Sequence, residues 1–594
     1  MVVALIERPI EQPERYERSG SVLSRWLGRL AEFLGWPIFW VVLVVVLLVP
    51  TACFLILAVS PRLFDQGSAW FTVNAFREAL TGVTLQGMAD SLVVGILAAL
   101  LAVAFAILLA WLLQRTNVGG RRLWSISIWA VLLVPSYIIA VGWQVVLGQG
   151  GVLAAVGLYS PIYTKIFFGP VGYTLVLAIK GLPFAYFAVA GSIAALGSSF
   201  EDAARVHGGG RLTTLRVMVP MILPSIFAGL IVVFAESIAD FGTAAVIAPN
   251  AHFPIATYNL YVALSSYPAN FGVAAVIGLM LVAAVAVALT LQKRFLKSRS
   301  YAVLGGRTRS AKQTRLTLRG QLIALGVLVV VFFVALGVPI LGALVSSMLK
   351  PFATLSLRNM TLSAYRGLFG ISGLGSSLGF SFKLAVLNGF LALILGTVIA
   401  RRLSRRGTKL IDKLLDVTVL AAIALPGLVL AAGYIFAYNL PILSSLGIDI
   451  YGTVLILIMA YLAGALPSTT RVLAGPLAQV KGSLLDAGRV HGAGLTQSWW
   501  RCAIPLLGPS LLWAWLLTFA ATFLELPASE LLAPPGTQPV AVAIISVLGK
   551  SNLSQGTALS IVALLIDLGM IIIISLLFRF LAPKGWRRLG ANVL

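Results

Sequence analysis

The sequence predicts an all-α membrane protein, a polytopic bundle of about twelve transmembrane helices arranged as two tandem six-helix repeats. Three observations support this fold class. Of the 594 residues, 59% are hydrophobic and only 10% are charged, and the mean hydropathy is +1.00. Apolar stretches long enough to cross a bilayer recur along the chain, and a polar segment near residue 202 returns near residue 486. Soluble domains carry about 25% charged residues, so large domains outside the membrane are excluded.

The expected spans follow from bilayer thickness, because a core of about 30 Å needs about 20 mainly apolar residues per helix. In the first half they lie near 37–59, 89–113, 123–147, 171–195, 225–247 and 270–292. In the second half they lie near 321–347, 378–400, 415–438, 451–473, 510–532 and 557–580. The resulting domains are an N-terminal tail (1–36), a first membrane domain (37–292), a basic linker (293–320), a second membrane domain (321–582) and a C-terminal tail (583–594).

Charge predicts the orientation. The chain carries 43 Lys and Arg against 19 Asp and Glu, a formal net charge of +24. The basic residues cluster near 115–122, 293–319, 401–413 and 579–588, whereas the alternate loops hold few. Because cytoplasmic loops are enriched in Lys and Arg, these clusters and both termini are expected to be cytoplasmic, and the charge indicates topology rather than nucleic-acid binding. The long apolar run of the first span has no cleavage-type site after it, so no removable signal peptide is expected.

An internal repeat with a period of about 285 residues relates the two halves. Residues 202–208 read Asp-Ala-Ala-Arg-Val-His-Gly, and residues 486–492 read Asp-Ala-Gly-Arg-Val-His-Gly. Each copy falls in a polar loop on the basic side, between the fourth and fifth expected spans, and is followed by two prolines. An even number of spans in each half makes this a parallel repeat, related by an axis along the membrane normal. A transport pathway would run along that axis.

The repeated loop resembles the coupling loop of ATP-binding-cassette importer permeases. That pattern is an acidic residue, two alanines, three further residues, a glycine, nine further residues, and then an Ile-x-Leu-Pro ending. The positions that carry the resemblance are Glu201, Asp202, Ala203, Ala204 and Gly208 in the first copy and Asp486, Ala487, Gly488 and Gly492 in the second. The second copy departs from the pattern with Gly488 and Cys502, and the first is one residue short before its proline.

The resemblance implies a transport subunit rather than an enzyme, with two copies of a separate ABC ATPase docked on the two loops. It also implies a periplasmic or extracellular solute-binding protein and a location in the bacterial inner membrane. ATP and magnesium would be bound by the partner ATPase, so no cofactor is expected on this chain. Gly549-Lys550-Ser551 lacks the rest of a phosphate-binding loop and does not change this expectation.

Within that superfamily, two phrases resemble the fused ferric-iron permeases. They are Ala-Glu-Ser-Ile-Ala-Asp-Phe-Gly-Thr at 235–243, and Leu-Glu-Leu-Pro-Ala-Ser at 524–529 with Ala-Pro-Pro-Gly at 533–536. Related permeases for thiamine, polyamines or aminoethylphosphonate share similar phrases, and these substrates remain alternatives.

Four acidic residues within the expected spans are candidate pathway residues: Glu236, Asp240, Glu525 and Glu530. An ionisable group in the bilayer costs about 2.5–3.5 kcal/mol on insertion scales, so each should face a cavity or a partner. Asp240 and Glu525 are repeat-equivalent and lie about 22 Å into their spans at 1.5 Å per residue, in the outer half of the membrane. They would either form an acidic pair across the axis or pair with neighbouring cations such as Lys180 or Lys383.

A second class of function stays open on the sequence alone. In a twelve-span secondary transporter driven by an ion gradient, the intramembrane acids would be proton or sodium sites. That interpretation accounts for Asp240 and Glu525 but assigns no function to the two repeated polar loops, in which a glycine interrupts the helix.

Overall fold

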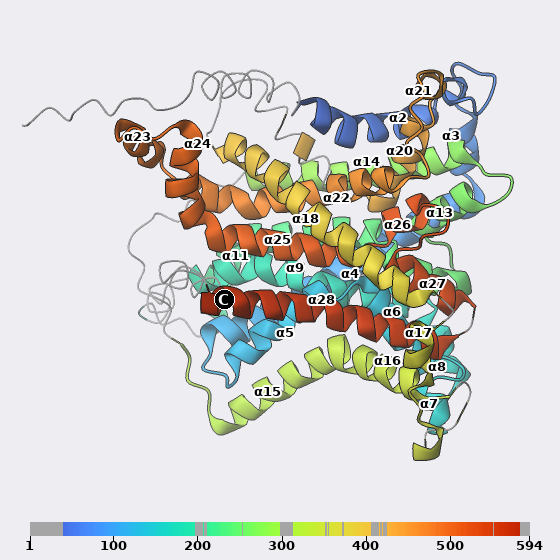
Figure 1. The fold of residues 1–594 in the computed structure, drawn as a ribbon. Helices are drawn as coiled ribbons and strands as arrows, with labels where there is room; N and C mark the ends of the chain where they lie inside the picture. The colour runs from blue at the N-terminus through green and yellow to red at the C-terminus, as the bar shows by residue number, and fades with distance from the viewer. Residues whose placement is uncertain are drawn as a thin grey trace, which may run out of the picture.

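The computed structural model describes residues 40–195, 206, 211–251, 253–297, 313–350, 353, 356–370, 373–404, 415, 418–419, 425–550 and 552–581. Secondary structure in these ranges is helical, and β-type pairing in them is limited to two isolated bridges. Eleven helices within the same ranges are long and apolar enough to cross a membrane (Figure 1). The predicted all-α, polytopic fold is confirmed.

The first half of the chain, residues 40–297, begins with a helix that starts at Trp40, passes through the π-helical turn η1 (Val44–Leu48) and runs into α2. Its longer helices are α2 (Val49–Leu57), α4 (Gly82–Arg115), α5 (Arg121–Leu133), α6 (Ser136–Leu147), α9 (Pro170–Ala195), α11 (Arg211–Ala239), α13 (Ala256–Ser265) and α14 (Phe271–Lys297). The shorter ones are α3 (Asn74–Ala79), α7 (Val152–Ala155), α8 (Pro161–Phe167) and α12 (Gly242–Ile247).

The second half, residues 313–581, repeats this order. Its longer helices are α15 (Leu318–Phe332), the π turn η4 (Phe333–Gly337) with α16 (Val338–Met348), α18 (Leu374–Ser404), α20 (Gly427–Tyr438), α22 (Val454–Gln479), α23 (Gly482–Val490), α25 (Ile504–Phe523), α27 (Val540–Gly549) and α28 (Leu553–Leu581). The shorter ones are α17 (Ser363–Leu368), α21 (Pro441–Ser445), α24 (Leu495–Ser498), the π turn η6 (Trp499–Ala503) and α26 (Pro527–Leu532). The span predicted at 415–438 falls partly outside the described residues, and α20 is its described helix.

Three predicted spans are not continuous helices. The span predicted at 123–147 is divided into α5 and α6 at Val134 and Pro135, because proline cannot supply the helical N–H. The spans predicted at 225–247 and 510–532 end at Ala239 and Phe523, and each is followed by a six-residue helix, α12 or α26. The expectation that Asp240 and Glu525 lie inside continuous helices is therefore wrong, since both lie at the breaks.

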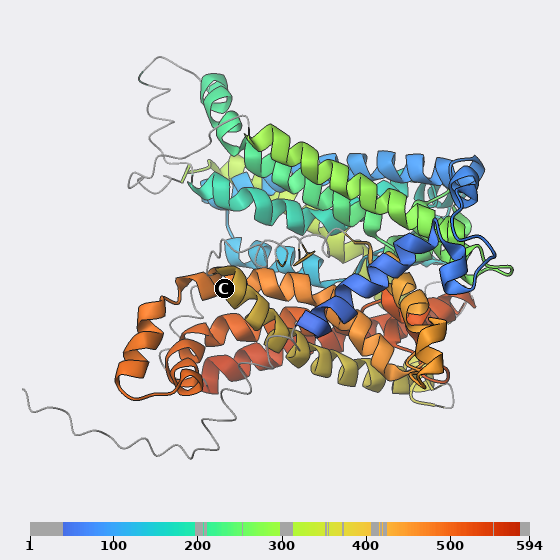
Figure 2. The same cartoon turned by 90° about the horizontal axis from the view of Figure 1, so that it is seen from above.

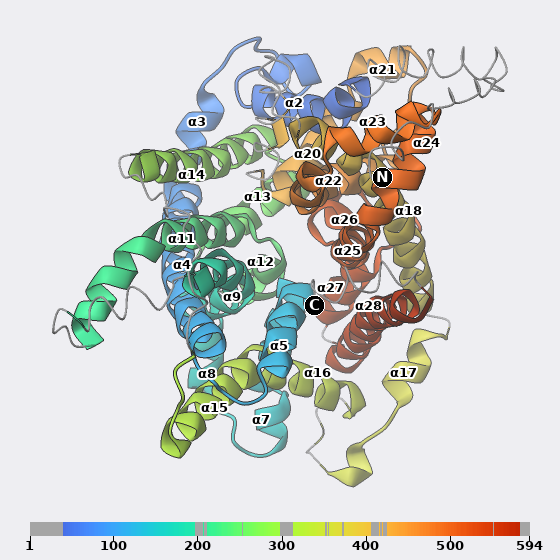
Figure 3. The same cartoon turned by 90° about the vertical axis from the view of Figure 1, so that its left-hand side faces the viewer.

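The first membrane helix of each half packs against the other half. Helix α2 contacts α20, and α16 contacts α6 (Figures 2 and 3). At both crossings a glycine meets a proline: Gly433 lies against the backbone of Pro50, and Gly142 lies against Pro339. A Cβ atom added to Gly433 would lie 2.6 Å from the Pro50 carbonyl carbon, and one added to Gly142 would lie 2.5 Å from the Pro339 Cα. Only glycine lets the paired helices approach this closely.

The two crossings differ in their hydrogen bonds. The carbonyl of Val46 has lost its helical donor because residue 50 is proline, and the Tyr434 hydroxyl lies 2.6 Å from that oxygen. The Tyr438 hydroxyl donates to the neighbouring carbonyl of Val45 at 2.9 Å. In the other crossing Trp143 follows Gly142 as Tyr434 follows Gly433, but its buried indole N–H has no hydrogen-bond partner among the described residues. As far as the described residues show, side-chain hydrogen bonds therefore join the helices at the α2–α20 crossing and not at the α16–α6 crossing.

The bundle has two distinct ends. Helix α23 and the C-terminal end of α28 lie at one end, and the short helices α3, α7, α8, α17 and α21 lie at the other (Figure 1). The first end carries basic residues at the ends of helices: Arg121 begins α5, and Arg402 and Arg579 lie in the last turns of α18 and α28. At this end Thr314, just before α15, pairs through its N–H with the carbonyl of Arg115 at 2.8 Å. The end of the predicted linker is thereby held against the loop between α4 and α5.

Candidate functional site

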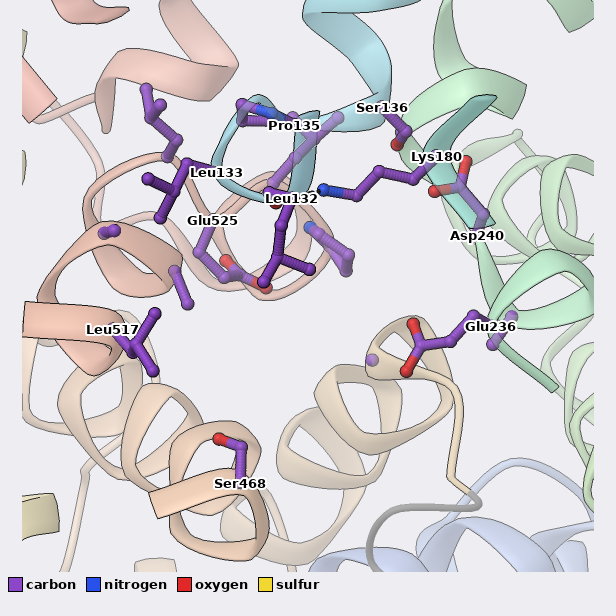
Figure 4. Close-up of a pocket in the computed structure, with 18 of the residues that line it drawn as sticks. Leu132, Leu133, Pro135, Ser136, Lys180, Glu236, Asp240, Ser468, Leu517 and Glu525 are labelled. Atoms are coloured by element: carbon purple, nitrogen blue, oxygen red, sulfur yellow. Dashed lines mark hydrogen bonds between the residues drawn. The ribbon is translucent and has the colours of Figure 1, made fainter. Parts of the chain in front are cut away.

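A cavity of about 610 Å³ lies between the two halves (Figure 4). Its walls come from equivalent elements: the α5–α6 break, α9 and the α11–α12 break of the first half, and the start of α20, α22 and the α25–α26 break of the second. The cavity thus follows the axis of the repeat, where the sequence placed a pathway. Its charged lining residues are Lys180, Glu236, Asp240 and Glu525.

The Asp240 carboxylate is bonded to the backbone. It follows the last residue of α11, and its Oδ1 accepts a hydrogen bond from the N–H of Thr243 at 2.6 Å, in the first turn of α12. The hydroxyl of Thr257, at the start of α13, donates to the Asp240 carbonyl at 3.2 Å. A carboxylate at this position satisfies an N–H that the helix leaves unpaired and complements the positive end of the helix dipole.

Glu525 has the equivalent position in the second half, and its carboxylate accepts more hydrogen bonds than that of Asp240. Its Oε1 accepts from the N–H of Ala528 at 2.8 Å, and its Oε2 accepts from the N–H and the hydroxyl of Ser529 at 3.0 and 2.9 Å. Both carboxylate oxygens are therefore used at the N-terminus of α26. Asp240 and Glu525 do face one cavity, as one prediction expected, and each is bonded to the helix that follows it.

Lys180 projects from the middle of α9 toward the α5–α6 break. Its Nζ donates to the carbonyl of Leu132 at 2.8 Å and to that of Val134 at 2.9 Å. These carbonyls lie at the C-terminal end of α5, where positive charge is favourable. In the described part of the chain Lys180 has no carboxylate within ion-pair distance. The alternative that Lys180 forms ion pairs with the intramembrane acids is therefore wrong.

The two other acidic candidates differ from this pair. Glu236, one turn before Asp240 on α11, lines the cavity with an exposed side chain. Glu530 is outside the cavity lining: its Oε1 accepts from the Tyr261 hydroxyl of α13 at 3.0 Å, a bond between the two halves. Its Oε2 is buried without a partner in the described residues. The structure thus brings three of the four predicted acids to one cavity and sets Glu530 apart.

The second predicted coupling loop forms a short helix at the basic end. Helix α23 carries Asp486, Ala487 and Gly488, projects beyond the membrane helices (Figure 1) and buries only Leu485 fully. Gly492 follows with φ of +83°, a left-handed conformation that glycine adopts without strain.

Two backbone hydrogen bonds close the end of this helix. The N–H of Gly492 donates to the Arg489 carbonyl at 3.0 Å, and that of Ala493 donates to the Gly488 carbonyl at 3.1 Å. This 5→2 and 6→1 pair is a Schellman motif, which ends the helix sharply. The first copy of the loop, with Glu201, Asp202, Ala203, Ala204 and Gly208, lies outside the described residues.

Comparison with known proteins assigns the family. The family model for the binding-protein-dependent transport system inner membrane component matches the chain twice, at residues 102–301 and 392–587. Together these matches cover well over half of the sequence. The chain belongs to this family of transport permeases.

The permease is similar to curated proteins over most of its length. It is 23% identical to the ferric transport system permease protein FbpB of Actinobacillus pleuropneumoniae, over 87% of this chain and 74% of that protein. It is 21% identical to the Fe(3+)-transport system permease protein FbpB 2 of Haemophilus influenzae, over 86% and 92%. A shorter match, 29% identical over 27% of this chain, is to the molybdenum transport system permease protein ModB of Escherichia coli. The first two matches confirm the resemblance to fused ferric-iron permeases.

The sequence interpretation of this permease missed the role of the helix breaks. Pro135 and Pro426 begin α6 and α20 at equivalent points of the cavity wall, and Pro527 begins α26. A proline inside an apolar window marks a helix boundary, and this signal could have located the breaks. Lys180 was considered only as an ion-pair partner, because nothing in the sequence indicated which carbonyls it would meet.

Proposed function

We propose that this permease forms the translocation pathway of an ATP-driven importer for ferric iron. The observation that supports the proposal best is the cavity on the repeat axis, whose lining carries three carboxylates against one lysine. An excess of carboxylates in a low-dielectric passage lowers the electrostatic barrier for a cation. The similarity to ferric transport permeases over most of the chain supports the same substrate.

We infer that two copies of an ABC ATPase bind the permease at its basic end, one on α23 and one on the equivalent loop around Asp202. The projection of α23 beyond the bundle and its largely exposed surface suit it to that contact. A solute-binding protein would dock at the opposite end, and both termini would be cytoplasmic. ATP and magnesium belong to the ATPase, and this chain needs no cofactor for its part.

The proposed mechanism couples the two ends through a change of shape. Closure of the ATPase pair can drive transport only if its contacts with the permease differ between inward-facing and outward-facing states. After the turn at Gly492, α24, η6 and α25 form one continuous helical run, which ends at the Glu525 break in the cavity wall. Because α23 packs against α24 and η6, a displacement of α23 would be passed to that run and along it to the cavity.

The test is reconstitution with the ATPase and the binding protein in proteoliposomes. We expect ATP hydrolysis stimulated by the loaded binding protein, and ATP-dependent uptake of ferric iron but not of thiamine, polyamine or aminoethylphosphonate. Uptake of one of these other solutes with ATP would replace iron as the substrate. Uptake that needs an ion gradient and no ATP would instead establish the secondary transporter and contradict the proposal.

A further inference from the structure

The charged residues of the cavity differ in whether they already make hydrogen bonds within the protein. Asp240 and Glu525 accept hydrogen bonds from the helices that follow them, and Lys180 donates to two carbonyls of the α5–α6 break. Glu236 lines the same cavity with an exposed side chain and has no hydrogen bond or ion pair with any described residue. In Figure 4 its carboxylate points away from the ribbon that carries it and toward the second half of the chain.

The internal repeat separates the same residues in a second way. Asp240 is matched by Glu525, so both halves keep an acid at the break. At the same offset Glu236 is matched by Ala521, which lines the cavity from the other half. A residue needed to hold the break is expected in both halves, whereas Glu236 occurs in one half only.

No hydrogen bond within the described residues explains why residue 236 is acidic. A carboxylate at membrane depth is unfavourable unless it meets a partner or water. Asp240 and Glu525 meet backbone N–H groups, whereas Glu236 faces the cavity, where the cationic lining residue is Lys180, which already donates to two carbonyls. The position suits a group that acts on whatever enters the cavity.

We infer that Glu236 is the substrate-selecting charge of this permease, which favours a cationic solute, and that Asp240 and Glu525 are positioning residues that hold α12 and α26. The identity of the solute in this inference rests on the proposed function, whereas the charge of the cavity does not. A carboxylate whose oxygens are unbonded exerts a larger field on an entering ion than one bonded to helix N–H groups.

A thiol probe can measure that field without transport. Cys53 and Cys502 are free thiols, so the background is C53S/C502S, and A521C places a reporter on the opposite cavity wall. The purified permease is modified with a cationic and, separately, an anionic methanethiosulfonate, and the ratio of the two rates is compared between variants. We expect E236Q to lower the cation-to-anion ratio about tenfold, as loss of one nearby charge predicts. E236D should keep the ratio, and E525Q should lower it by less than about threefold because that charge is balanced by N–H groups.

Three outcomes would overturn the inference: an unchanged ratio in E236Q, an equal fall in E525Q, or no modification of A521C by either reagent. Because the probe needs neither ATPase nor iron, its failure is distinguishable from failure of the iron-importer proposal.

Uptake by the complete complex supplies the functional readout. E236Q should reduce cation uptake per complex about tenfold, E236D should restore most of it, and both proteins should purify with the ATPase. Wild-type uptake by E236Q would remove Glu236 from substrate selection, whatever the solute proves to be.

Discussion

The first membrane helix of each half packs against the other half, α2 against α20 and α16 against α6. Replacing the glycines at these two crossings, Gly433 and Gly142, tests this packing. In Gly142→Ala the new methyl group would lie 2.5 Å from the Cα of Pro339, and in Gly433→Ala it would lie 2.6 Å from the Pro50 carbonyl carbon. Overpacking a tight contact costs about 1–3 kcal/mol. Alanine in place of a helical glycine returns about 0.5–1 kcal/mol, so at the middle of these ranges each variant should lose about 1 kcal/mol overall.

Gly191→Ala is the matched control, since Gly191 lies within α9 and is exposed, and an added Cβ would have no described atom within 4 Å apart from the neighbouring backbone of α9. It should gain about 0.5–1 kcal/mol. The free energy of unfolding is measured by titrating the purified protein in mixed micelles with a denaturing detergent. If Gly142→Ala and Gly433→Ala were as stable as Gly191→Ala, the close approach of these helices would be wrong.

The remaining predictions concern hydrogen bonds and the end of α23. Tyr434→Phe should destabilise the protein by about 1–2 kcal/mol because it leaves a buried carbonyl without its donor. Trp143→Phe, which removes an unbonded indole N–H, should cost less in the same unfolding assay. Gly492→Val should weaken ATPase binding while leaving membrane insertion intact, since valine is strained at φ of +83°; normal co-purification and transport would contradict the coupling assignment. The double change Asp240→Asn with Glu525→Gln should lower the midpoint of detergent unfolding, because it weakens the bonds at both breaks, and an unchanged midpoint would count against their positioning role.

Much of the fold could be predicted from the sequence because membrane helices are specified by length and apolar content. The repeat, the basic end and the loop at Asp486 were predicted from local patterns and are found in the structure. The breaks at Asp240 and Glu525 were missed because average hydropathy stays high across them. A window average does not detect a single carboxylate that satisfies the next helix.

The site was predicted in part. An acid in an apolar span had to meet a cavity or a partner, and this argument correctly selected Glu236, Asp240 and Glu525 as residues of one cavity. It could not distinguish a carboxylate bonded to N–H groups from one without a partner, since that depends on where the chain turns. Glu530 was grouped with them on the same argument, but its partner is a tyrosine hydroxyl from the other half, far away in sequence.

The packing of α2 against α20 and of α16 against α6 also determines the order in which the protein can assemble during synthesis. Helix α2 is made early, yet its partner α20 begins about 370 residues later. At a synthesis rate of about 5–20 residues per second, the Tyr434 and Tyr438 hydroxyls are made roughly 20–75 s after the carbonyls to which they donate. Helix α16, in contrast, enters the membrane after α6 and meets a partner already in place. The first half therefore cannot complete its packing by itself. Helix α2 finds its partner only when α20 of the second half has been synthesised and inserted.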